Sequence, residues 1–321
     1  MEGLTAYLGR EVPVINEFLE AQADALDGLV RDIARHVLLC GGKRIRPALT
    51  MLTARAYGFE GDILPLACAL EMLHSATLLH DDILDGAELR RGKTASHLVF
   101  GHTETILAGD VLLALANKLG AGYGKARISA ILADGIMATA TGEILELAHA
   151  ARPRVDRRMY MDIIIGKTAR LIETACRCGA AAASDDPAVE DLAGEYGLNL
   201  GIAFQLVDDA LDYVSPSDTT GKPEGGDLRE GKLTLPLILF LEAMPAAESE
   251  GLLARMREGG LNEDERRDVI ARIKDGGYAG RTRDVAGEYI ATAESALARM
   301  PDCPECAVLR ETALYVLHRS K

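Results

Sequence analysis

The sequence predicts an all-α fold, and two observations favour it. Helix-forming residues dominate, and aromatic residues make up only 4% of the chain, whereas strands are enriched in aromatic and β-branched side chains. Alternation of β-branched residues with a period of two is nowhere sustained, so no segment has the pattern of a half-buried strand. Apolar residues recur instead with the 3.6-residue period of a helix.

These helical stretches follow one another along the chain, separated by turn residues. Helices are predicted at about residues 11–39, 63–85, 103–119, 127–149, 157–183 and 188–213, with shorter helices from about residue 233 to the C-terminus. Glycine, proline and polar residues mark the breaks at 41–42, 58–62, 86–93, 120–124, 184–187 and 215–231. The last break is the longest, and long loops in compact domains are often functional lids.

The simplest division of the chain is a single domain spanning residues 1–321. Segments 105–123 and 128–147 are rich in alanine and glycine, which suits helices that pack closely around a centre. No repeat of solenoid period is present. One acidic pattern does occur twice, which suggests two halves that face a shared cavity.

Charge and composition argue against several classes of protein. Lysine and arginine number 35 against 49 aspartate and glutamate, a net charge of −14, which disfavours a nucleic-acid partner and binding to an anionic membrane. The N-terminus lacks the basic and apolar regions of a signal peptide. No uninterrupted apolar run approaches the roughly 20 residues of a membrane span, so we expect a cytoplasmic protein without a transmembrane segment.

The six cysteines do not form the pattern of a disulfide scaffold in a chain of this length. Cys303 and Cys306 have C-x-x-C spacing, which also occurs in zinc sites and redox pairs. A second C-x-x-C and a surrounding βαβ pattern are both absent. We therefore interpret the pair as plain thiols in a loop between helices.

The first acidic cluster is Asp81-Asp82-Ile-Leu-Asp85, at the C-terminal end of an apolar helical stretch. On a helix, Asp81 and Asp85 share a face and Asp82 lies about 100° away. Three carboxylates there repel one another and oppose the helix dipole. A cation is expected to compensate them.

The second cluster, Asp208-Asp209-Ala-Leu-Asp212, repeats this arrangement after another apolar stretch. Magnesium prefers carboxylate and water oxygens and often completes its octahedron with substrate phosphates. Either cluster alone is more often a solvated acidic helix end. Two matched clusters, each preceded by a hydrophobic helix, predict a magnesium-dependent site for a diphosphate.

Cationic residues that could bind a diphosphate lie near the first cluster in the sequence. Lys43 and Arg46 follow two glycines, and Pro47 can open a helix, so the pair could hold a phosphate beside a helix N-terminus. The segment lacks the spacing of a Walker A loop. Segment 90–93 adds further cations, and His74 lies two helical turns before Asp81, where a ligand role and a core role remain equally open.

Together these residues resemble the polyprenyl synthetase family, the trans-isoprenyl diphosphate synthases. The resemblance runs from about residue 20 to the end through the blocks GKRIRP (42–47), EMLHSATLLHDDILD (71–85), RRG (90–92), LAGD (107–110), GKT (166–168), FQLVDDALD (204–212) and GKLTLP (231–236). It implies the isoprenoid synthase fold, an all-α barrel of long, mostly antiparallel helices around a central cavity. It also implies a homodimer and, with diphosphate bound, three Mg2+ ions in each active site.

The resemblance implies roles for individual residues. Asp81, Asp85 and Asp208 would ligate magnesium, with Asp82, Asp209 and Asp212 supporting them; Lys167 and Lys222 would join these aspartates in catalysis. The isopentenyl diphosphate site would comprise Lys43, Arg46, His74 and Arg91. The allylic diphosphate site would comprise Arg90, Lys167, Thr168, Gln205, Lys222 and Lys232.

The implied reaction condenses isopentenyl diphosphate with geranyl or farnesyl diphosphate. Metal and cations stabilise the departing diphosphate, the double bond of isopentenyl diphosphate attacks the allylic cation, and a proton is lost to the released diphosphate. Two features depart from the family or stay open. Thr94-Ala95 stands where the family usually has Pro-Thr, and the role of the tail from Arg319 to Lys321 is undetermined.

Product length is predicted from Ala76 and Thr77, about one turn before the first cluster. Short-chain relatives usually place a bulky aromatic residue there, and neither side chain here is large. We therefore expect a medium-to-long, octaprenyl-like product. The alternative is that these small residues only allow close helix packing and another side chain stops elongation.

Other functions fit the sequence less well. A short-chain farnesyl or geranylgeranyl diphosphate synthase would have the same motifs, but it would usually carry a bulky residue at the floor, where this chain has small ones. A non-catalytic subunit of a heteromeric synthase typically loses the Asp-rich motifs, and a terpene cyclase would not need Lys43, Arg46 and Arg91. A structural helical bundle would leave the coincidence of motifs unexplained.

Overall fold

A computed structural model describes residues 1–151, 155–214, 225–258 and 260–319. The chain divides into two compact units. Unit 1 comprises Met1–Ile136, Leu171–Gly197 and Ala296–Thr312, and unit 2 comprises Met137–Arg170, Leu198–Ser295 and Ala313–Lys321. Several helices contribute residues to both units, so each unit is assembled from segments far apart in the sequence.

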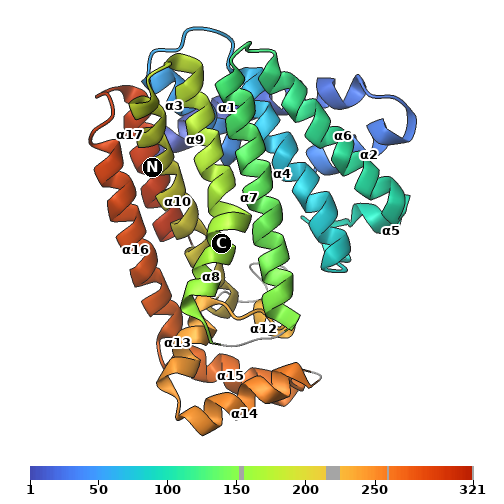
Figure 1. Cartoon of the computed structure of the whole chain (residues 1–321), viewed down its shortest axis with the longest axis vertical. Coiled ribbons are helices and arrows are strands. Elements are labelled where there is room, and N and C mark those ends of the chain that lie inside the picture. Colours follow the sequence, from blue (N-terminus) through green and yellow to red (C-terminus); the bar gives the residue numbers. More distant parts are fainter. Residues whose placement is uncertain (152–154, 215–224, 259, 320–321) are drawn as a thin grey trace. The chain divides into compact units, whose positions relative to one another are not determined.

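Unit 1 is built on α4, which packs along α6 and against α3 (Figure 1). Pro65 lies in the first turn of α4, where its missing N–H has no helical acceptor to lose. Much of α4 is buried, as expected of a core helix. The helices here are α1 (Glu2–Asp24), α2 (Gly28–Leu38), α3 (Ile45–Ala56), α4 (Leu64–Leu84), α5 (Ser96–Phe100) and α6 (His102–Ala121), with parts of α7 (Ala126–Ala151), α9 (Arg170–Ala183), α10 (Pro187–Val214) and α17 (Pro304–His318).

The predicted all-α fold is confirmed for the described residues, with two local differences in unit 1. A two-residue antiparallel pair, β1 (Leu89–Arg90) and β2 (Lys93–Thr94), forms the turn after the first acidic cluster. The single helix predicted over residues 11–39 is wrong, because the structure has α1 and α2 there. Gly28 begins α2 at φ +53, a left-handed conformation that glycine adopts without steric cost.

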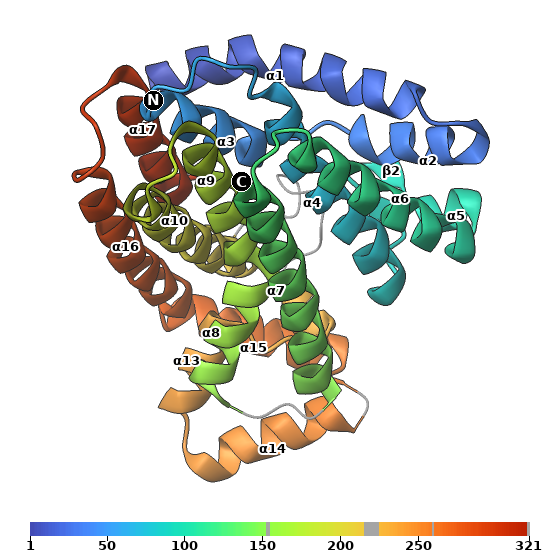
Figure 2. The ribbon, with the colours of Figure 1, turned by 45° about the horizontal axis from the view of Figure 1, so that its top comes forward.

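Unit 2 contains the C-terminal parts of α7 and α10 and a group of shorter helices. Helix α13 packs against α8, α14 and α15, as Figures 1 and 2 show. The segment predicted as one helix over 157–183 is a continuous helical run interrupted by a π-helical turn. The elements are α8 (Arg157–Ile164), the π turn η1 (Ile165–Ala169), α12 (Gly226–Arg229), α13 (Leu235–Ala243), α14 (Ala246–Arg257), α15 (Glu263–Asp275) and α16 (Tyr278–Leu297).

Within the described part of the chain, one helix is long and apolar enough to cross a membrane by length and composition alone. It covers Ala126–Ala150, with a mean hydropathy of 1.4. Two of its glycines allow close packing: a Cβ on Gly135 would lie 2.5 Å from Oγ1 of Thr174, and one on Gly142 would overlap the backbone of Lys167.

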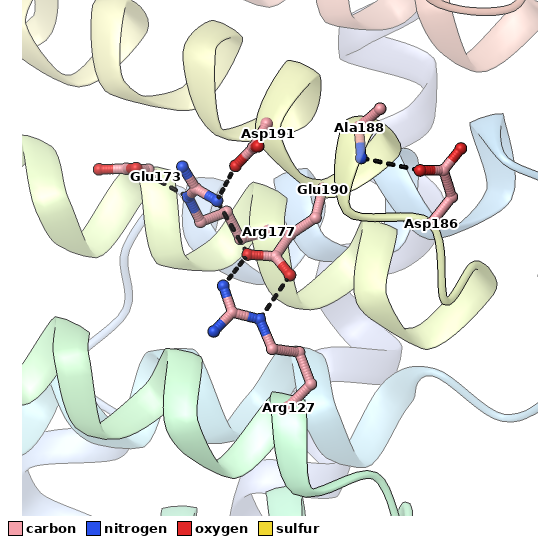
Figure 3. Close-up of polar contacts among 7 residues, drawn as sticks. All are labelled: Arg127, Glu173, Arg177, Asp186, Ala188, Glu190 and Asp191. Atoms are coloured by element: carbon pink, nitrogen blue, oxygen red, sulfur yellow. Dashed lines mark hydrogen bonds and ion pairs between the residues drawn. The ribbon is translucent and has the colours of Figure 1, made fainter.

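An ionic network connects α7, α9 and α10 within unit 1 (Figure 3). Glu190 accepts hydrogen bonds from Nε of Arg127 at 2.7 Å and from Nη1 of Arg177 at 2.8 Å. Arg177 also pairs with Glu173 and Asp191. Because the Glu190 carboxylate is largely buried between two guanidinium groups, this network fixes how the three segments pack.

Candidate active site

The first acidic cluster lies at the C-terminal end of α4, in unit 1. Asp82 is buried and accepts a hydrogen bond from Nε of Arg90 at 2.7 Å, with a second, short contact from Nη2. Asp81 is partly buried and Asp85 is exposed. Arg90 therefore balances the charge of Asp82, the buried aspartate of this cluster.

Cationic side chains gather around His74 on α4. Burial lowers the pKa of His74 well below its ordinary value, and the positive charges of Arg46, Arg91 and Arg90 lower it further. His74 is therefore neutral near pH 7 and can donate one hydrogen bond and accept another. Three of the residues assigned to the isopentenyl diphosphate site from the sequence lie in one electrostatic environment.

The loop before α3 carries the fourth residue of that set. Lys43 is exposed. Arg91 donates a hydrogen bond to the carbonyl oxygen of Gly41, which joins the loop to the turn after β1. Arg91 and Gly92 have φ values of 52° and 78°, so this turn holds a non-glycine residue in the left-handed region, a strained conformation often found at functional sites.

The two residues predicted to set product length differ in burial. Ala76 is completely buried in α4. Thr77 is partly buried, and its hydroxyl donates a hydrogen bond to the carbonyl oxygen of His74 at 2.9 Å. Neither side chain is bulky, and Ala76 is packed inside the helix bundle of unit 1.

The second cluster lies on α10, in unit 2, and its members have different partners. Asp209 is buried and accepts hydrogen bonds from the hydroxyl of Tyr160 at 2.5 Å and from Nε2 of Gln205 at 2.7 Å. Burial, helped by the charges of Asp208 and Asp212, raises its pKa to about 7. A cation bound nearby would therefore stabilise the ionised form of Asp209.

The other two aspartates of the cluster hold neighbouring segments. Asp212 accepts hydrogen bonds from the backbone N–H groups of Gly226 and Asp227, at 3.1 and 3.0 Å. It therefore fixes the start of α12. Asp208 pairs with Arg319 at 2.7 Å. The Arg319 guanidinium also lies 3.9 Å from the ring centroid of Phe204, and residues 320 and 321 of the tail lie outside the described residues.

A cavity of about 140 Å³ in unit 2 brings together most of the predicted allylic diphosphate residues. Its lining includes Lys167, Thr168, Gln205 and Lys232, together with Asp209. The Thr168 hydroxyl donates to Oε1 of Gln205 at 2.9 Å. The predicted Lys222 lies outside the described residues, and Arg90 belongs to unit 1.

Lys167 enters this cavity from the π turn and is balanced by two carboxylates of α7. It pairs with Glu143 at 2.8 Å and, by a shorter contact, with Glu146. Burial alone would lower the pKa of Lys167, but Glu146 and Glu143 leave it above its ordinary value. The ammonium group is therefore charged.

Four titratable residues of the cavity lining were given no role from the sequence: Glu146, His149, Tyr160 and Asp227. Glu146 and His149 are polar positions at the end of an otherwise apolar helix, a signal that could have been used. Asp227 lies in the segment 215–231 that was singled out as a long loop. Tyr160 gives no sequence signal, because only packing shows that its hydroxyl meets Asp209.

The donor chemistry of both clusters fits magnesium. Carboxylate oxygens are the ligands that Mg2+ prefers, and it usually keeps several waters or substrate phosphates. Among the described residues, no group of three or more His, Cys, Asp or Glu side chains is arranged to hold a metal by itself. The aspartates therefore suit an ion whose coordination is completed by water and a phosphate ligand.

Sequence and structure comparisons agree on the family. A family profile described as polyprenyl synthetase matches residues 27–273. Octaprenyl diphosphate synthase of Escherichia coli K12 is 32% identical over 308 residues, covering 95% of this chain and 94% of that protein. Geranylfarnesyl diphosphate synthase of Aeropyrum pernix is 34% identical over 320 residues, covering 96% and 98%.

Solved structures give the same result. The crystal structure of a polyprenyl synthase from Caulobacter crescentus CB15, complexed with calcium and isoprenyl diphosphate, matches with a TM-score of 0.93 and 36% identity, covering 100% of this chain and 98% of that one. The fold is therefore the isoprenoid synthase fold. The chain belongs to the polyprenyl synthetase family of prenyl-transferring enzymes.

Proposed function

We propose that this trans-prenyltransferase condenses isopentenyl diphosphate with geranyl or farnesyl diphosphate to give an octaprenyl-like product. The observation that carries the proposal is the cavity of unit 2. It gathers two lysines, a threonine hydroxyl and a glutamine amide around Asp209, a set that can donate several hydrogen bonds to a diphosphate. The residues 1–321 are proposed to act as one domain.

The two diphosphates are assigned to different sets of residues. We assign the isopentenyl diphosphate to Lys43, Arg46, His74 and Arg91 in unit 1, where neutral His74 adds a hydrogen bond without further charge. We assign the allylic diphosphate to Lys167, Thr168, Gln205 and Lys232 in unit 2, with Lys222 and Arg90 as further ligands.

Side chains of the protein stabilise the diphosphate as it leaves the allylic substrate. Lys167 and Lys232 donate hydrogen bonds to the diphosphate as the allylic C–O bond ionises, which stabilises the growing negative charge. Magnesium, when bound through Asp81, Asp85 and Asp208, would screen the same charge as a Lewis acid; we propose three ions per site. No side-chain base is assigned, because the released diphosphate can accept the proton.

A homodimer is proposed from exposed apolar surface on both units. On α7 of unit 2, Met137 and Ile144 are 62% and 66% exposed and Leu147 is 45% exposed. Their spacing places them on one helix face. On α6 of unit 1, Ile106 and Leu107 are also exposed. Large apolar side chains in a row mark protein interfaces more often than free surface, so Ile144→Lys should shift the mass measured by light scattering toward the monomer.

A cytoplasmic location is proposed as well. All six cysteines are free thiols in the structure, as expected of a protein in a reducing compartment. Fractionation of cells into cytosol, membrane and envelope material tests it directly.

The proposed function is tested by incubating purified protein with labelled isopentenyl diphosphate and either geranyl or farnesyl diphosphate, with and without magnesium. Chromatography of the dephosphorylated products should show metal-dependent chains of roughly octaprenyl length. Products of farnesyl or geranylgeranyl length would support the short-chain alternative. Absence of turnover in both incubations would favour a non-catalytic subunit.

A further inference from the structure

Arg44 has a buried side chain in an otherwise exposed loop. Gly41, Gly42 and Lys43 are exposed, whereas Arg44 is only 2% exposed. Its backbone is left-handed, at φ 50° and ψ 40°, directly before α3. A non-glycine residue in this region is strained, so the interactions of its side chain must compensate for the conformation.

The guanidinium group of Arg44 has a partner at each of its nitrogen atoms. Nη1 pairs with Oε1 of Glu71 at 2.6 Å, and Nε donates to Oδ1 of Asn16 at 2.9 Å. Nη2 donates to the carbonyl oxygen of Leu38. These partners come from α4, α1 and the end of α2, so one side chain joins the loop to three helices of unit 1.

A buried ion pair of this kind contributes little to net stability, because desolvation of the two charges offsets their attraction. Its better attested effect is to select one conformation of the chain. In this protein the selected conformation is that of the loop that carries the residues proposed to bind isopentenyl diphosphate. Lys43 and Arg46 flank Arg44, and His74 lies one helical turn after Glu71 on the same side of α4.

The loop is also held from its other side by Arg91. This arginine donates to the carbonyl oxygen of Gly41, and its Nη1 lies 2.7 Å from the position that a Cβ on Gly42 would occupy. Gly42 has φ +135, so a side chain there would be strained as well as overlapping. The loop is clamped between one buried and one exposed guanidinium group.

We propose that Arg44 and Glu71 are a positioning pair that fixes the loop so that Lys43 and Arg46 are pre-aligned for the diphosphate of isopentenyl diphosphate. The inference rests on the proposed function. Pre-alignment reduces the conformational entropy that two long cationic side chains lose on binding. Small misplacements of such groups weaken binding and turnover strongly.

Replacing Glu71 with Gln tests the pair, since the amide keeps the size of the side chain but removes the charge that holds Arg44. The KM for isopentenyl diphosphate should rise by about tenfold or more. The KM for the allylic diphosphate should change by less than about twofold, because that substrate does not use this loop. Steady-state kinetics with each substrate varied in turn measures both values.

Glu190→Gln is the matched control. Glu190 is also a largely buried glutamate paired with arginines in unit 1 (Figure 3), and no diphosphate residue belongs to its network. Its variant should lose thermal stability comparably and keep both KM values. Two milder variants cover the case in which Glu71→Gln does not fold: Asn16→Ala removes a single contact of Arg44, and Arg44→Lys keeps the charge without the planar fork.

The outcomes separate this inference from the proposed function. If wild-type protein does not elongate isopentenyl diphosphate, the proposed function fails. If wild-type protein is active and the folded Glu71, Asn16 and Arg44 variants show a selective rise in the KM for isopentenyl diphosphate, the positioning role is supported. Unchanged KM values in folded variants, or a parallel loss of every kinetic parameter with melting temperature, would overturn it.

Discussion

The two Asp-Asp-x-x-Asp clusters share a sequence pattern, but their second aspartates have different partners. Asp82 on α4 is paired with the guanidinium group of Arg90, so its charge is balanced within the protein. Asp209 on α10 is held by the neutral donors Tyr160 and Gln205, and burial raises its pKa to about 7. The charge of Asp82 is thus balanced by an arginine of the chain, whereas Asp209 has neutral donors and would gain more from an added cation.

Removing magnesium should have the largest effect. If the aspartates act through metal ions, dialysis against a chelator should lower prenyl transfer by more than about a thousandfold, because the metal supplies several kcal/mol of charge stabilisation. Incorporation of labelled isopentenyl diphosphate measures the loss, and adding magnesium back should restore it. Turnover that survives complete metal removal would contradict the roles of both clusters.

Tyr160→Phe should sharpen the comparison, since it removes a donor from Asp209 only. Loss of a group that orients a metal-binding carboxylate typically costs about tenfold to a hundredfold in metal affinity or activity. The magnesium concentration for half-maximal rate should rise accordingly. Tyr196→Phe is the control, because Tyr196 is equally buried but donates to the carbonyl oxygen of Leu309; an equal rise in both variants would argue against a specific role.

Asp82→Asn and Asp209→Asn should affect stability differently in metal-free protein. Asp82→Asn leaves Arg90 without its counter-charge and should lower the free energy of unfolding by about 2 kcal/mol. The pKa of Asp209 is raised on folding, so the folded state loses stability as pH rises through that value. Asp209→Asn should therefore be neutral or stabilising at a higher pH. Thermal melts of both variants decide this, and equal destabilisation would remove the distinction.

Ala76→Phe should shorten the product, and of the changes considered it should alter the rate of prenyl transfer least. Ala76 is completely buried in α4, one turn before the first cluster, so a phenyl ring there should block a growing chain if this position forms the floor. Chromatography of products should show shorter chains, with the first condensation slowed by less than about tenfold. An unchanged distribution from a folded variant would place the floor elsewhere, and Ala69→Phe, also buried in α4, controls for overpacking.

The sequence by itself determined the family, the helical fold and most of the candidate site. The Asp-rich motifs and their neighbouring cations are local patterns, and local patterns survive in the sequence whatever the packing. Their chemistry follows from residue type and spacing on a helix. Lys167, Thr168, Gln205 and Lys232 were assigned through the family resemblance, before their common cavity was known.

Only the tertiary structure decided which partner each charge has. Arg90 was assigned to a substrate from the sequence but holds Asp82, and Tyr160 meets Asp209 across 49 positions of sequence. Arg44 points into the core between two residues assigned to a diphosphate. Such pairings depend on burial, because only removal from water makes an unpaired charge costly enough to select one partner.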